Sequence, residues 1–356
     1  PGPVRSLSHF LRHIQTELFP ALEEIFGRLS PAEKRLVEIL EVVQIERLLS
    51  VPHAGLVGRP LNDRRPIARA LVAKSVLGLT STRSLLQALA GSPMLRRICG
   101  WSHLHDVPGE STFSRAFGEF ADANLGQRIH ESLVKEIFDE RLVGHVCRDS
   151  TAVEAPERPP ARMKGEKRKR KKPSKRISRQ LSGMAVEEMV SELPKKSTWG
   201  CKINSRGHKY FWPGYKLHVD WSDCGIPITC LITSASLHDS QVAVPLASLT
   251  SQRVQSLYDL MDSAYDSRQI KEHSQSLGHV PIIEMVRRGD FDSRPDHPVY
   301  RTERLRIRTL AEQGFGRLKE SFGARTVRVR GSTRVMAHLM FGILALTADR
   351  ILALAN

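Results

Sequence analysis

Three acidic residues stand in sequence settings that suit the binding of a metal ion. Asp149 ends the run GHVCRD and Asp262 ends the run LYDLMD, and a serine follows each of them. Short apolar, β-prone runs of this kind predict buried strands, so both carboxylates are expected at the end of a strand. The third residue, Glu312, lies in LRIRTLAEQGFGRLK, where apolar residues recur at helical spacing. These three carboxylates can therefore converge on a divalent cation.

The chemistry of such a site is phosphodiester exchange. Hard cations such as Mg²⁺ prefer oxygen ligands, and two of them can hold the attacking and the leaving oxygen. At about 100° per residue, one stripe of the predicted helix, about 60° wide, holds Leu305, Arg308, Glu312 and Lys319. A surface row of salt bridges has the same pattern and is the ordinary interpretation of an isolated helix. The two aspartates favour the metal site instead.

The elements predicted around these residues make an α/β fold. Strands are expected at residues 141–150, 214–221, 226–233, 256–262 and 279–286. The fourth of these would lie parallel to the first, which brings Asp262 beside Asp149. Helices are expected at 241–249 and 267–278, and Asp239 is interpreted as a helix N-cap rather than as a residue of the site.

The first 138 residues are predicted to be all helical. A helix begins after Ser30, with Pro31 at its first position and Glu33 as the partner of a capping box. Several short helices with small-residue turns follow, and a longer helical segment starts behind Gly109. This pattern fits a helix-turn-helix module, although any compact helical domain shows it too. The arginines considered as DNA contacts are Arg83, Arg96, Arg97 and Arg115.

The composition points to a polyanionic partner. The 356 residues carry a formal net charge of +16, which attracts nucleic acid without selecting a sequence. Five cysteines without a C-x-x-C pair indicate neither a zinc ribbon nor a disulfide framework. The apolar run at 339–354 is interrupted by Asp349 and Arg350, so it is interpreted as a core helix and no membrane contact is expected. A cytoplasmic location is expected.

A basic stretch interrupts the α/β pattern at about residues 156–205. It is polar and its centre lacks aromatic residues, so it is predicted to be a mobile insertion. Six consecutive cations are predicted to bind DNA phosphates by counterion release: Lys167, Arg168, Lys169, Arg170, Lys171 and Lys172. A solvated linker is the alternative.

These motifs together resemble the DDE transposases of bacterial insertion sequences, in particular the group with a Y-(2)-R-(3)-E-(6)-K signature. Arg308, Glu312 and Lys319 match the signature, whereas Leu305 stands at the Tyr position. The resemblance also covers DST at 149–151, GYKLHVD at 214–220, the TSASLHDS run at 233–240 and DSAYDS at 262–267.

The resemblance implies an RNase H-like mixed sheet with flanking helices at 139–356, preceded at 1–138 by a helical domain for DNA-end binding or dimerisation. Asp149, Asp262 and Glu312 would be the catalytic ligands of two Mg²⁺ ions, with Mn²⁺ as a substitute. Arg308 and Lys319 would hold DNA phosphates. The implied activity is strand cleavage and strand transfer at the terminal inverted repeats of an insertion sequence, by a homodimer or higher oligomer on double-stranded DNA in the bacterial nucleoid.

Two other functions share these features. An RNase H-like nuclease without strand transfer would use the same carboxylates, and a DNA-binding repressor would need only the helical half. The departure at Leu305 also leaves two alternatives. Either Tyr300 supplies the missing hydroxyl, or the protein works without it.

Overall fold

The computed structural model describes residues 14–49, 62–139, 141–159, 175–203, 207–284 and 298–355. The chain divides into two compact units. The first unit comprises Pro1–Ile137, Arg317–Val329 and Thr333–Asn356, and the second comprises Phe138–Gly316 and Arg330–Ser332. The prediction assigned everything after residue 138 to one domain, whereas the C-terminal segments cluster with the N-terminal helices.

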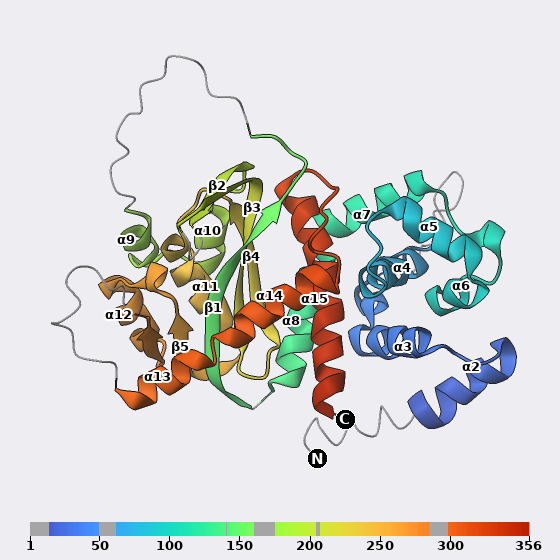
Figure 1. Ribbon diagram of the computed structural model, residues 1–356, viewed down its shortest axis with the longest axis horizontal. Helices are drawn as coiled ribbons and strands as arrows, with labels where there is room; N and C mark the ends of the chain where they lie inside the picture. The colour runs from blue at the N-terminus through green and yellow to red at the C-terminus, as the bar shows by residue number, and fades with distance from the viewer. Residues whose placement is uncertain are drawn as a thin grey trace. The chain divides into compact units, whose positions relative to one another are not determined.

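The described part of the first unit is helical, as predicted (Figure 1). Its helices are α2 (Phe19–Phe26), α3 (Pro31–Val43), α4 (Arg64–Val76), α5 (Thr82–Gly91), α6 (Pro93–Cys99), α7 (Glu110–Asp122), α8 (Leu125–Ile137) and α15 (Ser332–Ala355), with short turns η1 (Ile14–Leu18), η2 (Ile45–Leu48) and η3 (Leu104–Asp106). The capping box predicted for α3 is confirmed, because the Ser30 and Glu33 side chains each accept a hydrogen bond from the other's backbone N–H. The longer segment after Gly109 divides into α7 and α8 where Asn124 takes a positive φ of 50°.

Helix α15 is the core of the first unit. It is long and apolar enough to cross a membrane by length and composition, but 83% of its most apolar window is buried inside the protein. Met340 lies against Gly126 of α8, where an added Cβ would stand 2.7 Å from the Met340 Cβ. Asp349 accepts a hydrogen bond from Arg35 of α3 at 2.8 Å, so the charge that interrupts the apolar run has a partner. The prediction of a core helix is confirmed.

The second unit is built on one six-stranded sheet. Its described strands are β1 (Leu142–Glu154), β2 (Thr198–Ile203), β3 (Lys209–Ser222), β4 (Pro227–Ser234), β5 (Gln255–Met261) and β6 (Val280–Ile283). The order is β2-β3-β1-β5-β6, with β4 also paired to β3. Strand β3 is antiparallel to β1, β2 and β4, whereas β5 is parallel to β1 and β6 is parallel to β5. This is the RNase H-like mixed sheet that was predicted, with β5 parallel to β1 as expected and with β2 as an additional strand.

Helices cover both faces of this sheet (Figure 1). They are α9 (Arg176–Gln180), α10 (Val186–Ser191), α11 (Ala243–Ser251), α12 (Arg268–Ser276), α13 (Val299–Arg306) and α14 (Thr309–Glu320), with η4 (Asp239–Gln241) and η5 (Ser263–Tyr265). On one face, Thr250 of α11 donates a hydrogen bond to Asp220 of β3. On the other, the Cys147 thiol of β1 donates to the carbonyl of Ile307, between α13 and α14. The sheet is therefore the middle layer of three.

The face toward α11 holds a buried ion pair. Arg148 of β1 donates two hydrogen bonds to Asp220 of β3, at 2.9 and 2.8 Å, and both side chains are at most 1% exposed. The same guanidinium contacts the Met261 sulfur at 3.4 Å. Removing one partner of such a pair typically costs about 3–5 kcal/mol, because the other charge stays buried. The contact of Arg148 with Met261 joins the residues that directly precede Asp149 and Asp262.

The basic stretch departs from its prediction beyond residue 174. The six cations from Lys167 to Lys172 lie outside the described residues. From Lys175 onward, however, the chain forms α9, α10 and β2 rather than a mobile insertion. Leu193, after α10, is 3% exposed in a cluster with Leu237, Val242 and Leu246. This half carries apolar residues to bury, which is why it folds.

Candidate active site

Asp149 lies inside β1, where β1 stops pairing with β5. The parallel register runs from Leu142↔Gln255 to Arg148↔Met261, so Asp149 follows its last pair. The prediction that β1 closes at Asp149 is wrong, because β1 continues to Glu154 along β3. One carboxylate oxygen accepts the Ser150 backbone N–H at 2.7 Å. Burial, with a smaller contribution from the charge of Asp262, raises the pKa of Asp149 to about 6.

Asp262 directly follows β5, as predicted, and its carboxylate is the N-cap of η5. Its Oδ1 accepts the Ala264 backbone N–H at 2.9 Å. Burial raises the pKa of Asp262, and the charges of Asp239 and Glu284 raise it further, while Arg308 lowers it. The two aspartates act on one another electrostatically across the parallel pair β1–β5. The sheet therefore brings together two of the three predicted carboxylates.

Glu284 occupies the equivalent position on the next parallel strand and was missed from the sequence. It directly follows β6, and its backbone N–H donates to the Met261 carbonyl at 3.1 Å. Its carboxylate forms an ion pair with Arg308 at 2.9 Å. The strand-end pattern that identified Asp262 also applies here, but the predicted strand continued through Glu284 and hid it.

Arg308 lies between these carboxylates. It lowers the pKa of both Asp149 and Asp262, so its charge is near both. The Arg308 side chain is 18% exposed, and its Nε is buried without an acceptor in the described part of the chain. The guanidinium is therefore held largely buried beside the carboxylates, with its ion pair to Glu284.

Asp239 is a further acidic residue beside the pair, and its interpretation as an N-cap is wrong. His238 is the cap of η4, because its Nδ1 accepts the Ser240 backbone N–H at 3.4 Å. Asp239 instead forms an ion pair with Lys216 of β3 at 2.9 Å. Although burial raises the pKa of Asp239, the nearby His218 and Lys216 hold it below its usual value. A sequence motif, HDS at 238–240, was present, but local propensity favoured the cap.

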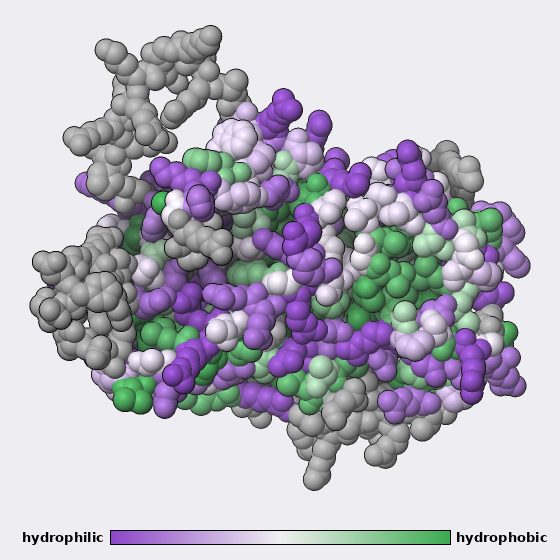
Figure 2. All heavy atoms as spheres, viewed as in Figure 1, coloured by the Kyte–Doolittle hydropathy of each residue, from purple (hydrophilic) through white to green (hydrophobic). Residues whose placement is uncertain are grey.

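The helix expected at 305–319 is broken. Helix α13 ends at Arg306 and α14 begins at Thr309, with hydrogen bonds of i to i+3 type between them, such as Arg308 N–H to Leu305 carbonyl at 3.1 Å. This tighter winding interrupts the regular helical spacing from which the stripe of Leu305, Arg308 and Glu312 was predicted. The two helices still follow one another across the sheet, and hydrophilic residues dominate their outer surface in Figure 2.

Glu312 is exposed on the first turn of α14, one turn after Arg308. The helix is held close to the sheet, since a Cβ on Gly314 would stand 2.5 Å from the Trp221 ring of β3. Phe315 packs edge-on against the same ring, with centroids 5.2 Å apart. Lys319 lies on the last turn of α14, in the segment that clusters with the first unit. Within the described residues, no three His, Cys, Asp or Glu side chains are arranged to hold a metal.

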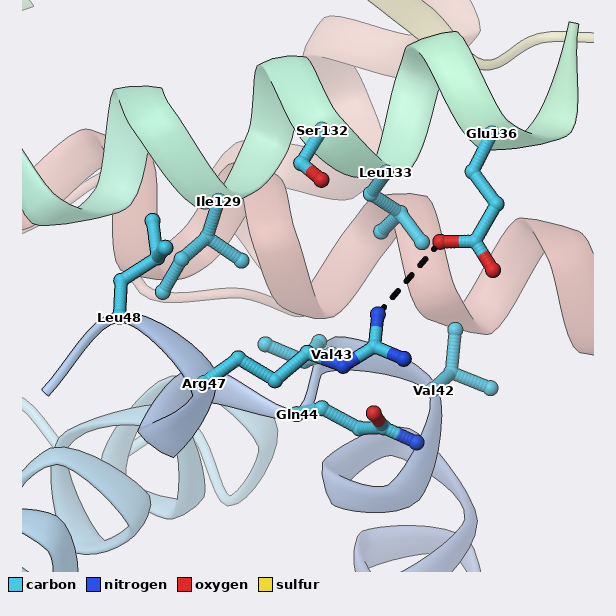
Figure 3. Close-up of a pocket in the computed structure, with 9 residues that line it drawn as sticks. All are labelled: Val42, Val43, Gln44, Arg47, Leu48, Ile129, Ser132, Leu133 and Glu136. Carbon is cyan, nitrogen blue, oxygen red and sulfur yellow. Dashed lines mark ion pairs between the residues drawn. The ribbon is translucent and has the colours of Figure 1, made fainter. Parts of the chain in front are cut away.

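The donor set nevertheless fits a divalent cation. Asp149 and Asp262 offer hard oxygen ligands, and their raised pKa values show that two carboxylate charges are costly there without a compensating cation. By contrast, a small pocket of about 70 Å³ in the first unit offers no such set (Figure 3). Its one carboxylate, Glu136 of α8, is paired with Arg47 of η2 at 3.5 Å.

Comparison with known proteins agrees with this geometry. Residues 144–348 match the family described as the transposase DDE domain, and residues 24–119 match the transposase domain (DUF772). No curated protein sequence gives a match. Among solved structures, the Mos1 transposase paired-end complex with left transposon end aligns over 97% of this chain and 96% of that chain, at 13% identity and a TM-score of 0.22. A TM-score of 0.22 does not establish a common fold, and the fold is assigned here from the order of the strands. With more than half of its length matched, the chain belongs to the DDE transposase family.

Proposed function

We propose that the protein binds the terminal inverted repeats of an insertion sequence, cleaves DNA there and joins the freed ends to a target. The observation that supports this most directly is the pair Asp149 and Asp262, which lie side by side where the pairing of β1 with β5 stops, with Arg308 beside both. The partners would be double-stranded element ends and target DNA, bound by a homodimer or higher oligomer.

The carboxylates would hold two Mg²⁺ ions, with Glu312 completing the ligands that Asp149 and Asp262 begin. Bound Mg²⁺ polarises the phosphoryl oxygens and acidifies the attacking water or 3′-hydroxyl. Arg308 would bind a non-bridging phosphate oxygen with the part of its guanidinium that stays accessible beside the carboxylates. As the new P–O bond forms, the P–O3′ bond breaks and the leaving oxygen takes up a proton. Lys319 would hold a phosphate farther along the strand.

The test uses labelled DNA from the regions that flank the coding sequence, with Mg²⁺ present and the products mapped. Asp149→Asn, Asp262→Asn and Glu312→Gln should each abolish cleavage while leaving DNA binding within about twofold, because they remove metal ligands rather than DNA contacts. The unchanged chain should also yield products with a 3′-hydroxyl joined to target DNA. Cleavage without joining would identify a nuclease.

Glu284→Gln is the matched control for Glu312→Gln. Glu284 ends a parallel strand beside Asp262 and pairs with Arg308, so its loss should reduce cleavage without abolishing it. If instead Glu284→Gln abolishes cleavage and Glu312→Gln does not, the third ligand is Glu284. Undiminished cleavage in either aspartate variant would refute the site altogether.

A further inference from the structure

Helix α13 lies against β5 and β6 although none of its residues is buried (Figure 1). A helix is ordinarily attached to a sheet by the apolar residues of one face. In α13, however, the apolar side chains of Val299 and Tyr300 are exposed. Polar contacts must therefore supply much of its attachment. They matter for the proposed site, because Arg308 follows two residues after the end of α13.

Arg304 attaches α13 to two residues that are partners in the sheet. His145 of β1 pairs with Tyr258 of β5, and their rings stack with centroids 5.1 Å apart. The Arg304 guanidinium carbon lies 4.0 Å from the centroid of the Tyr258 ring, which is a cation–π contact. Its Nη1 lies 2.7 Å from His145 Nε2. We call these contacts of Arg304 with His145 and Tyr258 the Arg304 anchor.

The anchor requires a neutral His145. Arginine only donates hydrogen bonds, so Nε2 of His145 accepts and its proton is on Nδ1. The Asp223 carboxylate supports this tautomer, since it lies 3.5 Å from Nδ1 and also accepts the His145 backbone N–H at 3.0 Å. The titratable or charged groups described around the ring are thus Asp223, Tyr258 and Arg304. Protonation of Nε2 would remove the acceptor and place two cations in contact.

The contacts between β1 and the chain after Arg304 continue toward Asp149. Side chains alternate along a strand, so His145, Cys147 and Asp149 lie on one face of β1. Arg304 donates to His145, and the next residue on that face, Cys147, donates to the Ile307 carbonyl at 3.6 Å. The Ile307 backbone N–H donates to the Arg304 carbonyl at 3.0 Å. The segment from Arg304 to Ile307 therefore runs along β1 in the direction of Asp149.

We propose that Arg304 is a positioning residue, which holds α13 on the sheet so that Arg308 can meet the phosphate that is cut. Arg308 directly follows this segment and is paired with Glu284 at 2.9 Å, so a displacement of α13 displaces Arg308 as well. Acid releases the anchor by protonating His145. This inference rests on the proposed function, which it deepens by adding a positioning residue and a dependence on pH.

Hydrogen exchange measured by mass spectrometry tests the anchor without DNA. Peptides covering 299–309 should exchange about tenfold faster in Arg304→Ala, because α13 opens more often. Peptides from β1 and β5 should stay protected and show that the sheet remains folded. Arg306→Ala removes the same charge from an exposed position of the same helix, so exchange should stay within about twofold. Unchanged exchange in Arg304→Ala would refute the anchor.

Cleavage at saturating DNA and Mg²⁺ tests the positioning role. Arg304→Ala and His145→Phe should each lower the maximal rate about tenfold, since a displaced group loses its contact in the transition state. Phe keeps a ring beside Tyr258 but offers no acceptor. The double variant should be no slower than the slower single variant, as expected for residues that act through one contact. KM for DNA should stay within about twofold. Losses that multiply would overturn the proposal.

His145→Gln tests the release by acid. Gln offers a carbonyl oxygen to Arg304 and is not protonated in this range. Burial, with a smaller contribution from Arg304, holds the pKa of His145 below its usual 6.5 although Asp223 raises it. The anchor is therefore complete above pH 6.5 and is lost as pH falls through this lowered pKa.

The unchanged chain should thus lose more cleavage in acid than His145→Gln does. Asp149 titrates in both proteins, so the ratio of their rates cancels its contribution. A ratio that stays constant from about pH 7.5 to about pH 5 would refute the release by His145.

The positioning role and the proposed function fail differently. If α13 loosens in Arg304→Ala without slower cleavage, only the positioning role is refuted. Slower cleavage with unchanged exchange would mean that Arg304 contacts DNA directly, which also overturns the proposal. If the unchanged chain does not cleave DNA at all, the proposed function is wrong, whereas exchange of the 299–309 peptides still decides whether the anchor exists.

Discussion

Asp149 carries a charge that the folded protein stabilises poorly when no metal is bound. Its pKa is raised to about 6 from an ordinary 3.8, chiefly by burial. As pH rises from about 4 to 6, the unfolded chain therefore ionises first and the folded state loses stability. Above pH 6 the whole decrease in the free energy of unfolding remains.

Asp149→Asn should accordingly stabilise the metal-free protein above pH 6. The gain is on the order of 2 kcal/mol, from about two pKa units reduced by screening, and it should disappear below about pH 4, where both states are protonated. Melting temperatures across this pH range measure it. Saturating Mg²⁺ should stabilise the unchanged chain more than the variant. If the Asn variant were no more stable than the unchanged chain at pH 7.5, burial of the Asp149 charge would not destabilise the fold as expected here.

Asp149 and Asp262 could be predicted because a carboxylate after an apolar, β-prone run is a local pattern. Glu284 follows the same pattern, but its strand was predicted to end three residues later than β6 does. Asp239 could not be found this way, because its position depends on the ion pair with Lys216 of β3, which is a tertiary contact. The roles of Glu312 and Lys319 stay predictions.

Helix α14 shows how one missing side chain sets the position of an element. The Gly314 Cα lies where a Cβ would meet three atoms of the Trp221 ring within 2.8 Å. Gly316, on the same helix, has no atom within 4 Å of such a Cβ. Helical spacing predicted the apolar face here, but neither this close approach nor the break before Thr309 could be derived from it.

Gly314→Ala should displace α14 from the sheet and with it Glu312. Overpacking of this kind costs about 1–3 kcal/mol, against a gain of up to about 1 kcal/mol in helix propensity, so a net destabilisation and a loss of cleavage are expected. Gly316→Ala has only the gain and should be neutral or stabilising. Chemical denaturation and cleavage assays of both variants measure the difference. Equal stability of the two variants would show that the Trp221 ring moves aside to make room for the added methyl group.

The whole chain, at +16, is expected to bind DNA largely through non-specific contacts. If so, the contribution of the basic stretch to DNA affinity can be measured separately from that of the rest of the chain. Replacing residues 162–174 by a neutral linker leaves α9, which begins at Arg176, intact. Binding should weaken about equally for flanking and random DNA, and the salt slope should flatten, because fewer counterions are released. Fluorescence anisotropy at several salt concentrations measures both. An unchanged slope would make the stretch a linker.

The two units illustrate a limit of prediction from local patterns. The boundary near residue 138 follows from the change from helical to strand-like sequence. The sequence does not predict that α15 clusters with the N-terminal helices, because its apolar residues would suit the core of either unit. Contacts such as Arg35 with Asp349, 314 positions apart, decide it.

The parallel pairing of β1 with β5 also bears on the protein during its synthesis. The paired positions are more than a hundred residues apart in the chain, and the antiparallel neighbour of β1 is synthesised well before β5. Pairing over such a separation forms late in folding, after local hairpins and helices. A ribosome-bound chain that has not yet released β5 therefore carries Asp149 without Asp262 beside it. By this reasoning the N-terminal helices can fold first, and the two aspartates of the proposed site come together only after β5 has been synthesised.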